Sequence, residues 1–98
     1  MPESNESLRV HVWVKGRVQG VGFRAHVEFA ARRAGVAGWV RNVGSDTVEA
    51  VAEGEREEIE RFVEAMKTGP RGARVEESRV ESETPTGEFS GFQVRRSL

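Results

Sequence analysis

Apolar and polar residues alternate in the first regular segment of the chain, residues 8–15. Its apolar side chains fall on every second position, which predicts a strand with one buried face. From Phe23 to Ala34 the apolar residues recur at helical spacing, and Gly35 stands where a left-handed helix stop belongs. We therefore expect a strand followed by a helix, and before them a disordered tail over residues 1–7.

The residue pattern in the second half of the chain predicts two strands, a helix and two further strands. Residues 37–43 and 47–53 have strand character, and the three residues between them fit a hairpin loop. A second helix with one apolar stripe is expected to open at Gly54 and to end at Gly69. The pattern closes with two less regular strands, residues 75–83 and residues 91–96.

The expected order is therefore β-α-β-β-α-β with one additional short strand. Each helix has a single apolar stripe and the better strands have a single apolar face. The economical arrangement is an α+β, ferredoxin-like βαββαβ sandwich, with an antiparallel sheet and two helices on one face. A chain of 98 residues has the length of one domain, which we place at residues 8–98. This layout serves many unrelated functions, so the fold alone does not indicate one.

Composition narrows the classes of function. The chain has no cysteine, which excludes disulfides, thiolate nucleophiles and thiolate metal ligands. Its net charge of −1 argues against nucleic acid as the main partner, because binding to phosphate backbones usually requires a basic surplus. No stretch resembles a signal peptide or is long and apolar enough to span a bilayer. We expect a cytoplasmic protein without a membrane partner.

Between the first strand and the first helix lies a glycine-rich segment, Gly16-Arg17-Val18-Gln19-Gly20-Val21-Gly22-Phe23-Arg24. Its glycines indicate a loop and not a continued strand, and they permit positive φ, so successive backbone N–H groups can converge on an anion. The following helix adds its own free N–H groups and the positive end of its dipole. Arg24 is expected in the first helical turn, where its planar guanidinium can hold two phosphoryl oxygens. Alternatively, the glycines only form a tight turn and Arg24 is solvated.

Two other phosphate-binding motifs fit this segment less well. Gly20 to Ala25 matches the G-x-G-x-x-A variant of the dinucleotide fingerprint. However, the next strand offers no acidic residue for a ribose, and the chain then turns into a hairpin. A Walker-type loop needs lysine and then serine or threonine where this chain has Phe23 and Arg24. We set both motifs aside.

A second cluster, Gly38-Trp39-Val40-Arg41-Asn42, lies on the second predicted strand. Asn42 stands where that strand gives way to the hairpin, and taken alone this position favours a turn-initiating role. The two histidines, His11 and His26, have no Asp/Glu cluster at ligand spacing beside them. We expect no metal and no cofactor, and a surface role for both histidines.

The motif GRVQGVGFR followed by GWVRN resembles the acylphosphatases, in the same order and at a similar separation. The resemblance covers residues 8–96 and includes the βαββαβ layout of that family. It implies a hydrolase that cleaves the carboxyl–phosphate bond of small acyl phosphates, giving carboxylate and inorganic phosphate without a metal. It also implies that the loop 16–23 cradles the phosphate, that Arg24 binds it, and that Asn42 positions the attacking water.

The chain departs from the family pattern in the hairpin after Asn42. The family usually has a glycine four residues after this asparagine, whereas this chain has Asp46 there and Gly44 two residues earlier. We expect Gly44 to take the positive-φ role of the turn. The change is then a variation of the hairpin that bears on the water geometry at Asn42.

Three other functions stay open. Similar domains fused to larger maturation enzymes handle carbamoyl phosphate; this chain ends two residues after Arg96, so we expect it to act alone, as a monomer. The same layout also serves RNA recognition through aromatic residues on the central strands. Here the third strand is expected to expose a face without aromatics, made of Thr47, Glu49, Val51 and Glu53. A non-enzymatic phosphate sensor accounts less well for Asn42.

Overall fold

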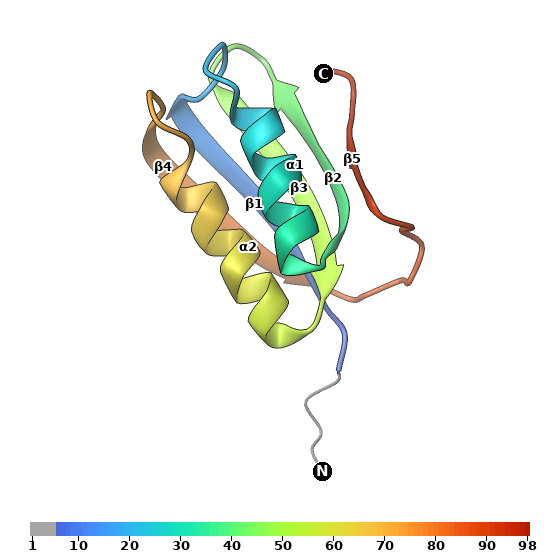
Figure 1. Cartoon of the computed structure of the whole chain (residues 1–98). Coiled ribbons are helices and arrows are strands. Elements are labelled where there is room, and N and C mark those ends of the chain that lie inside the picture. The colour runs from blue at the N-terminus through green and yellow to red at the C-terminus, as the bar shows by residue number, and fades with distance from the viewer. Residues whose placement is uncertain (1–5) are drawn as a thin grey trace.

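Two helices cover one face of a five-stranded sheet (Figure 1). The computed structural model describes residues 6–98, and residues 1–5 of the expected tail lie outside the described residues. The elements in chain order are β1 (Leu8–Arg17), α1 (Phe23–Ala34), β2 (Ala37–Val43), β3 (Thr47–Gly54), α2 (Arg56–Thr68), β4 (Arg74–Glu83) and β5 (Phe92–Val94). The predicted ferredoxin-like layout, with both helices on one face, is confirmed.

The sheet is mixed, whereas the sequence predicted an antiparallel one. The strands lie in the order β4-β1-β3-β2-β5, and β5 is parallel to β2 while the other neighbours are antiparallel. β4 ends at the same end of the sheet where β2 begins. Because residues 84–91 cross to the other edge at that end, the chain enters β5 in the direction of β2.

The core lies between the helices and the sheet. Its members come from alternate positions of β1 and β3 and from one stripe of each helix, as the periodicity predicted. Val12 of β1, Ala50 of β3 and Phe62 of α2 are each 0% exposed. Burial of these apolar surfaces is the main force that holds the two layers together.

The first strand is longer than its glycines suggested. β1 continues through Gly16 to Arg17, and its register with β4 shifts between Lys15 and Gly16. Gly16 has φ +141°, and a Cβ there would lie 2.3 Å from the backbone oxygen of Arg74. A glycine at a bulge therefore lets the strand continue beside β4. The loop proper is shorter than predicted and comprises residues 18–22.

The second helix begins after the position that the sequence favoured. Gly54 is the last residue of β3, and Glu55 is the N-cap of α2. The side chain of Glu55 accepts from the backbone of Glu58, and the Glu58 carboxylate accepts from the Glu55 N–H at 2.9 Å. This reciprocal capping box, which glycine cannot form, determines where α2 starts.

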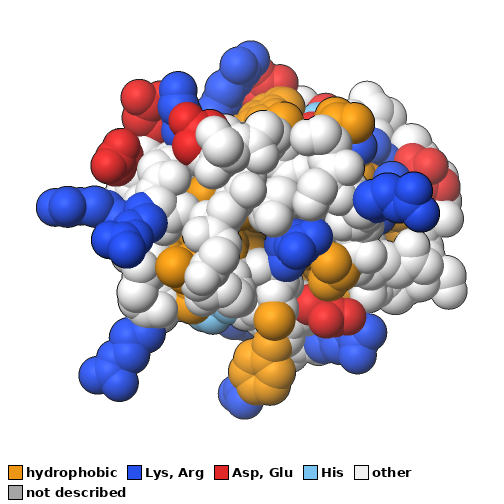
Figure 2. All heavy atoms as spheres, turned by 90° about the horizontal axis from the view of Figure 1, so that it is seen from above, with side chains coloured by type: hydrophobic (Ala, Val, Ile, Leu, Met, Phe, Trp, Pro, Cys, Tyr) orange, Lys and Arg blue, Asp and Glu red, His pale blue; other side chains and the backbone are white. Residues whose placement is uncertain are grey.

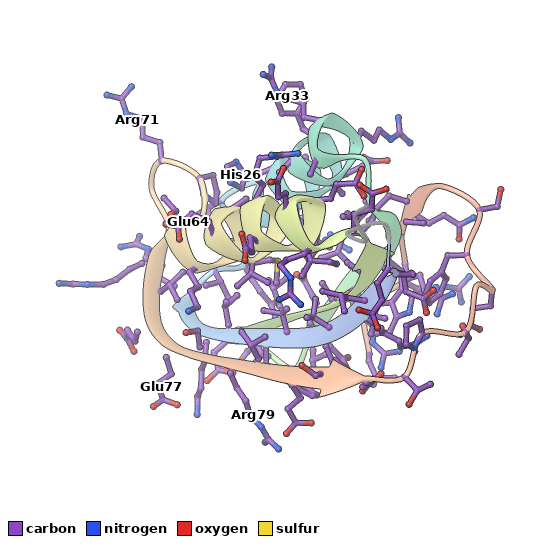
Figure 3. The ribbon with its side chains drawn as sticks, turned by 90° about the horizontal axis from the view of Figure 1, so that it is seen from below. His26, Arg33, Glu64, Arg71, Glu77 and Arg79 are labelled. Atoms are coloured by element: carbon purple, nitrogen blue, oxygen red, sulfur yellow. The ribbon has the colours of Figure 1, made fainter. Side chains whose placement is uncertain are left out.

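The face of the sheet away from the helices is also covered, contrary to the prediction that β3 exposes it. Glu49, Val51 and Glu53 are only 7%, 1% and 7% exposed. Glu49 accepts hydrogen bonds from Arg41 and His11. Towards the edge, side chains of β4 such as Glu77 and Arg79 point away from the helices (Figure 3).

Glu53 is held by segments far away in the sequence. Its carboxylate accepts from Arg9 Nη1 at 2.9 Å, from the Thr86 N–H at 2.9 Å and from the Gly87 N–H at 3.0 Å. The chain between β4 and β5 therefore folds over this end of β3. The period of two within β3 predicts only that one face of the strand is apolar. It does not predict which segments cover the other face.

We predict that Glu53 makes stability depend on pH. Burial alone would raise the pKa of Glu53, but hydrogen bonds from Thr86, Arg9 and Gly87 outweigh it and hold the pKa below 4.5. A carboxylate with a lowered folded pKa contributes stability above its unfolded pKa, and this contribution is lost as the pH falls through the folded value. Glu53→Gln should lower the free energy of unfolding at neutral pH by about 1–3 kcal/mol.

Urea denaturation between about pH 7 and about pH 3 checks this prediction, because that interval spans ordinary glutamate titration. The variant should lose less stability on acidification than the wild type. Glu60→Gln, on the exposed side of α2, is the control and should follow the wild type. If the free energy of unfolding depended on pH in the same way for the wild type and for Glu53→Gln, the role given to Glu53 would be contradicted.

Candidate active site

Three separate segments meet at one end of the molecule. They are the loop between β1 and α1, the first turn of α1, and the end of β2 (Figure 1). Between them lies an open cavity of about 370 Å³, lined by Val18, Gln19, Gly20, Gly22, Phe23, Arg24, Ala25, Glu28, Asn42 and Val94. Figure 2 views this end, where both basic and acidic side chains project around a largely uncharged surface.

Most of the predicted site residues line this cavity. Arg24 and Asn42, which are far apart in the sequence, both do so. Three predicted phosphate-binding residues do not line it. Gly16 and Arg17 belong to β1, and Val21 packs against the core.

The loop is shaped so that its backbone can bind an anion. Gly20 and Gly22 have φ +75° and +78°, a conformation that strains other residues, and Gly22 is the N-cap of α1. The first hydrogen bond of the helix runs from His26 N to Gly22 O at 3.0 Å. The amides of residues 23–25 precede that bond, and therefore have no acceptor within the helix. No acidic residue stands in the first turn, so the positive end of the helix dipole is not neutralised there.

Arg24 is the second residue of α1 and is half-buried. It forms no ion pair with another residue in the described range 6–98. The nearest carboxylate along the helix, that of Glu28, also lines the cavity and pairs with Arg32 Nη2 at 3.0 Å. The guanidinium of Arg24 is therefore available to a bound anion, in addition to the free amides of residues 23–25.

Asn42 is fixed by strand pairing on both sides. On one side it lies opposite Val48 of β3. On the other side its backbone oxygen accepts from Leu98 N at 2.9 Å, and Gly44 N donates to Leu98 O at 3.1 Å. The last residues of the chain thus extend the β5 edge as far as Asn42. This pairing holds the backbone of Asn42 beside the cavity.

The hairpin after Asn42 has the turn glycine that the sequence predicted. Gly44 has φ +61°, so the expectation that it takes the positive-φ role is confirmed. The backbone oxygen of Asp46 accepts from Gly16 N at 2.9 Å. Aspartate can provide this backbone contact as well as glycine can, so the departure from the family pattern leaves the hairpin attached to β1.

Sequence reasoning missed four features of the cavity. Ala25 and Glu28 follow Arg24 on the same helix, and helical spacing could have indicated them. Val94 comes from β5, and no local signal links that strand to the loop. Gln19 was treated only as part of the loop, but its side chain also contacts the hairpin beside Asn42.

The two histidines lie outside the cavity lining. His11 is on the face of the sheet opposite the helices, with Nδ1 2.8 Å from Glu83 and Nε2 2.6 Å from Glu49. His26 lies on α1, beside Phe23. Within residues 6–98, no group of three or more His, Cys, Asp and Glu side chains is arranged to hold a metal ion.

The family model described as acylphosphatase matches residues 10–94. The chain belongs to the acylphosphatase family. It is 51% identical over 89 residues to an acylphosphatase of Roseiflexus sp. (strain RS-1), which covers 91% of this chain and 96% of the relative. A Pyrobaculum islandicum acylphosphatase is 49% identical over 90 residues, covering 91% of this chain and 95% of the relative.

Solved structures agree with this assignment. The chain superposes on an acylphosphatase from Coxiella burnetii with a TM-score of 0.86 and 38% identity, covering 93% of this chain and 94% of the other. It also matches 13% of full-length HypF, in a phosphate- and nucleotide-bound structure, with a TM-score of 0.85 and 26% identity over 99% of this chain. As an acylphosphatase, the protein hydrolyses acyl phosphates. None of the helices in the described range is long and apolar enough to cross a membrane.

Proposed function

We propose that this acylphosphatase binds the phosphoryl group of its substrate in the cavity between the 18–22 loop and α1, and that a water oriented by Asn42 attacks the phosphorus. The observation that supports this most is that Arg24 and Asn42, from different elements, line one cavity. Arg24 is the side chain that binds the phosphate in this scheme. The backbone of the residues of this segment that line the cavity, from Val18 to Arg24 without Val21, completes the cradle.

The chemistry requires little beyond positioning and charge. The water oxygen forms a new bond to phosphorus, and the two protons of the water remain on the phosphate product. The acyl carboxylate leaves with the electron pair of the broken P–O bond. This leaving group is stable as an anion, so no strong acid has to protonate it. Negative charge spreads over the phosphoryl oxygens in the transition state, and Arg24 with the free amides of α1 can stabilise it.

We predict that turnover does not require a metal ion. Release of inorganic phosphate from benzoyl phosphate should continue in excess EDTA, with kcat/KM unchanged within about twofold, because backbone amides and Arg24 supply the positive potential that a metal would otherwise supply. A loss of activity that added Mg²⁺ or Zn²⁺ restores would contradict the metal-free mechanism. A wild-type protein that binds phosphate without turning over acyl phosphates would instead support the phosphate sensor.

The preferred substrate can be identified by comparing kcat/KM for different acyl phosphates. HypF, which the chain resembles at 26% identity, was solved with phosphate and nucleotide bound. Acetyl phosphate and carbamoyl phosphate should be assayed in parallel, because both carry the phosphoryl group that the proposed cradle binds and they differ in the acyl group. We propose small acyl phosphates as the substrates, and a higher kcat/KM for acetyl phosphate agrees with this.

We further propose a monomeric protein of the cytoplasm, with one domain over residues 8–98. The edge strand β4 has charged side chains at six of its ten positions, which discourages pairing with another sheet edge. Light scattering during gel filtration tests the monomer, and fractionation of cells tests the location.

Nucleic acid is not a proposed partner. The acidic side chains of β3 are buried on the sheet face away from the helices, and they do not form a surface on which bases could stack. Filter binding with single-stranded RNA should show no retention.

A further inference from the structure

Gln19 connects the phosphate loop to the hairpin that follows Asn42. Its Nε2 lies 3.3 Å from Val43 O, 3.0 Å from Gly44 O and 3.0 Å from Thr47 O. Backbone oxygens only accept hydrogen bonds, so three of them around one side-chain atom identify that atom as the amide nitrogen. One side chain of the loop therefore donates to both ends of the β2–β3 turn.

These contacts matter because the two proposed functional side chains stand on different elements. Arg24 lies on α1, directly after the loop, and Asn42 lies on β2, directly before Val43. Pairing within the sheet fixes Asn42 relative to β3, and β3 and the hairpin are paired with β1, but these pairs end at Gly16, before the loop residues 18–22. The Gln19 amide spans that gap, since it leaves the loop and ends on the residue next to Asn42.

We propose that Gln19 is a positioning residue for the attacking water, and that it acts by holding the hairpin, and with it Asn42, at a set distance from the bound phosphate. The inference rests on the proposed function of this site. A displacement of about 1 Å in the reacting geometry can reduce a rate by about 10²-fold, so a tether between two catalytic elements has a measurable effect. Phosphate binding itself depends on the loop amides and Arg24.

Gln19→Met tests the proposal, because methionine has similar length and no hydrogen-bond donor. We expect kcat for benzoyl phosphate to fall on the order of 10-fold, with the inhibition constant of inorganic phosphate unchanged within about twofold. Gln93→Met, an exposed glutamine on β5, is the matched control and should behave as the wild type. Circular dichroism and thermal melting establish that each variant is folded.

A double-mutant cycle separates positioning from a general loss of structure. If Gln19 acts through Asn42, then Gln19→Met should reduce kcat by less than about twofold when Asn42→Ala is already present. The proposal would be overturned if Gln19→Met lowered kcat by the same factor in the wild-type and in the Asn42→Ala background. So would an unchanged kcat with weaker phosphate inhibition, which would make Gln19 a phosphate-binding side chain only.

Gln19→Glu gives a second test should Gln19→Met fail to fold. The ionised carboxylate has no donor and faces three carbonyl oxygens, whereas the protonated acid can donate one hydrogen bond. The kcat of this variant relative to the wild type should therefore rise as the pH falls towards about 4.5, the region of ordinary glutamate titration. A constant ratio across that range would contradict the tether. Full activity of Asn42→Ala would instead show that the proposed function of the site is wrong.

Discussion

Arg24→Ala should nearly abolish turnover, with kcat/KM for benzoyl phosphate reduced by about 10³-fold or more, a loss comparable to removing an arginine that stabilises phosphoryl transfer elsewhere. Arg24 is half-buried at the cavity, in the first turn of a helix without acidic neighbours in that turn. Its removal leaves the amides of the loop as the main source of positive potential. Inhibition by inorganic phosphate should weaken strongly as well, because in the proposed binding mode the guanidinium donates to the phosphoryl oxygens already in the ground state.

Two further variants make this prediction specific. Arg24→Lys keeps the charge but lacks the planar fork that matches two oxygens, so its activity should lie between those of alanine and wild type. Arg33→Ala removes an exposed arginine near the other end of the same helix, which points away from the sheet (Figure 3), and should leave kcat/KM unchanged. The activity of all three variants is measured as release of inorganic phosphate from benzoyl phosphate. An Arg24→Ala enzyme with more than about a tenth of wild-type activity would contradict the assigned role.

Asn42→Ala should lower kcat by about 10²-fold or more and leave inhibition by inorganic phosphate nearly unchanged, the pattern expected when one preorganised polar group is lost. The strand pairing of Asn42 uses only its backbone, through Val48 and Leu98, so alanine should keep the fold. The two catalytic variants are therefore distinguished by phosphate inhibition, which Arg24→Ala weakens and Asn42→Ala spares.

Ser45→Ala, on the exposed tip of the same hairpin, is the matched control for a nonspecific effect of changing this turn. Steady-state kinetics with benzoyl phosphate and inhibition by inorganic phosphate give kcat and the inhibition constant for each variant. Wild-type kcat in Asn42→Ala would mean that the water is oriented by another group. A parallel loss of kcat and of phosphate inhibition would make Asn42 part of the phosphate cradle instead.

Local pattern was sufficient to predict most of the architecture. The period of two in β1, the helical spacing from Phe23 to Ala34, and Gly35 after it each reflect a contact made within a few residues. The same holds for the turn at Gly44, where positive φ is a property of one residue. The two motifs that resemble the family, GRVQGVGFR and GWVRN, then singled out Arg24 and Asn42, which the structure brings to one cavity.

Apart from the start of α2, which a local capping box decides, the errors in the predicted strands have one physical origin. The strand through Gly16 continues because β4 lies beside it, and β5 is parallel because the chain crosses the end of the sheet first. Glu53 is buried because Thr86 and Gly87 fold over it. Each outcome depends on a neighbour supplied by a distant part of the chain, which periodicity does not report.

The order of the elements, the positive φ of the loop glycines and the identity of the charged and polar side chains around them follow from local sequence. The position of Val94 of β5 in the cavity lining and the hydrogen bonds from Gln19 to the hairpin depend on the folded arrangement of the whole chain. The physical reason is that propensity and periodicity act over a few residues, whereas a binding site is formed by hydrogen bonds and packing between segments that meet only when the sheet has formed.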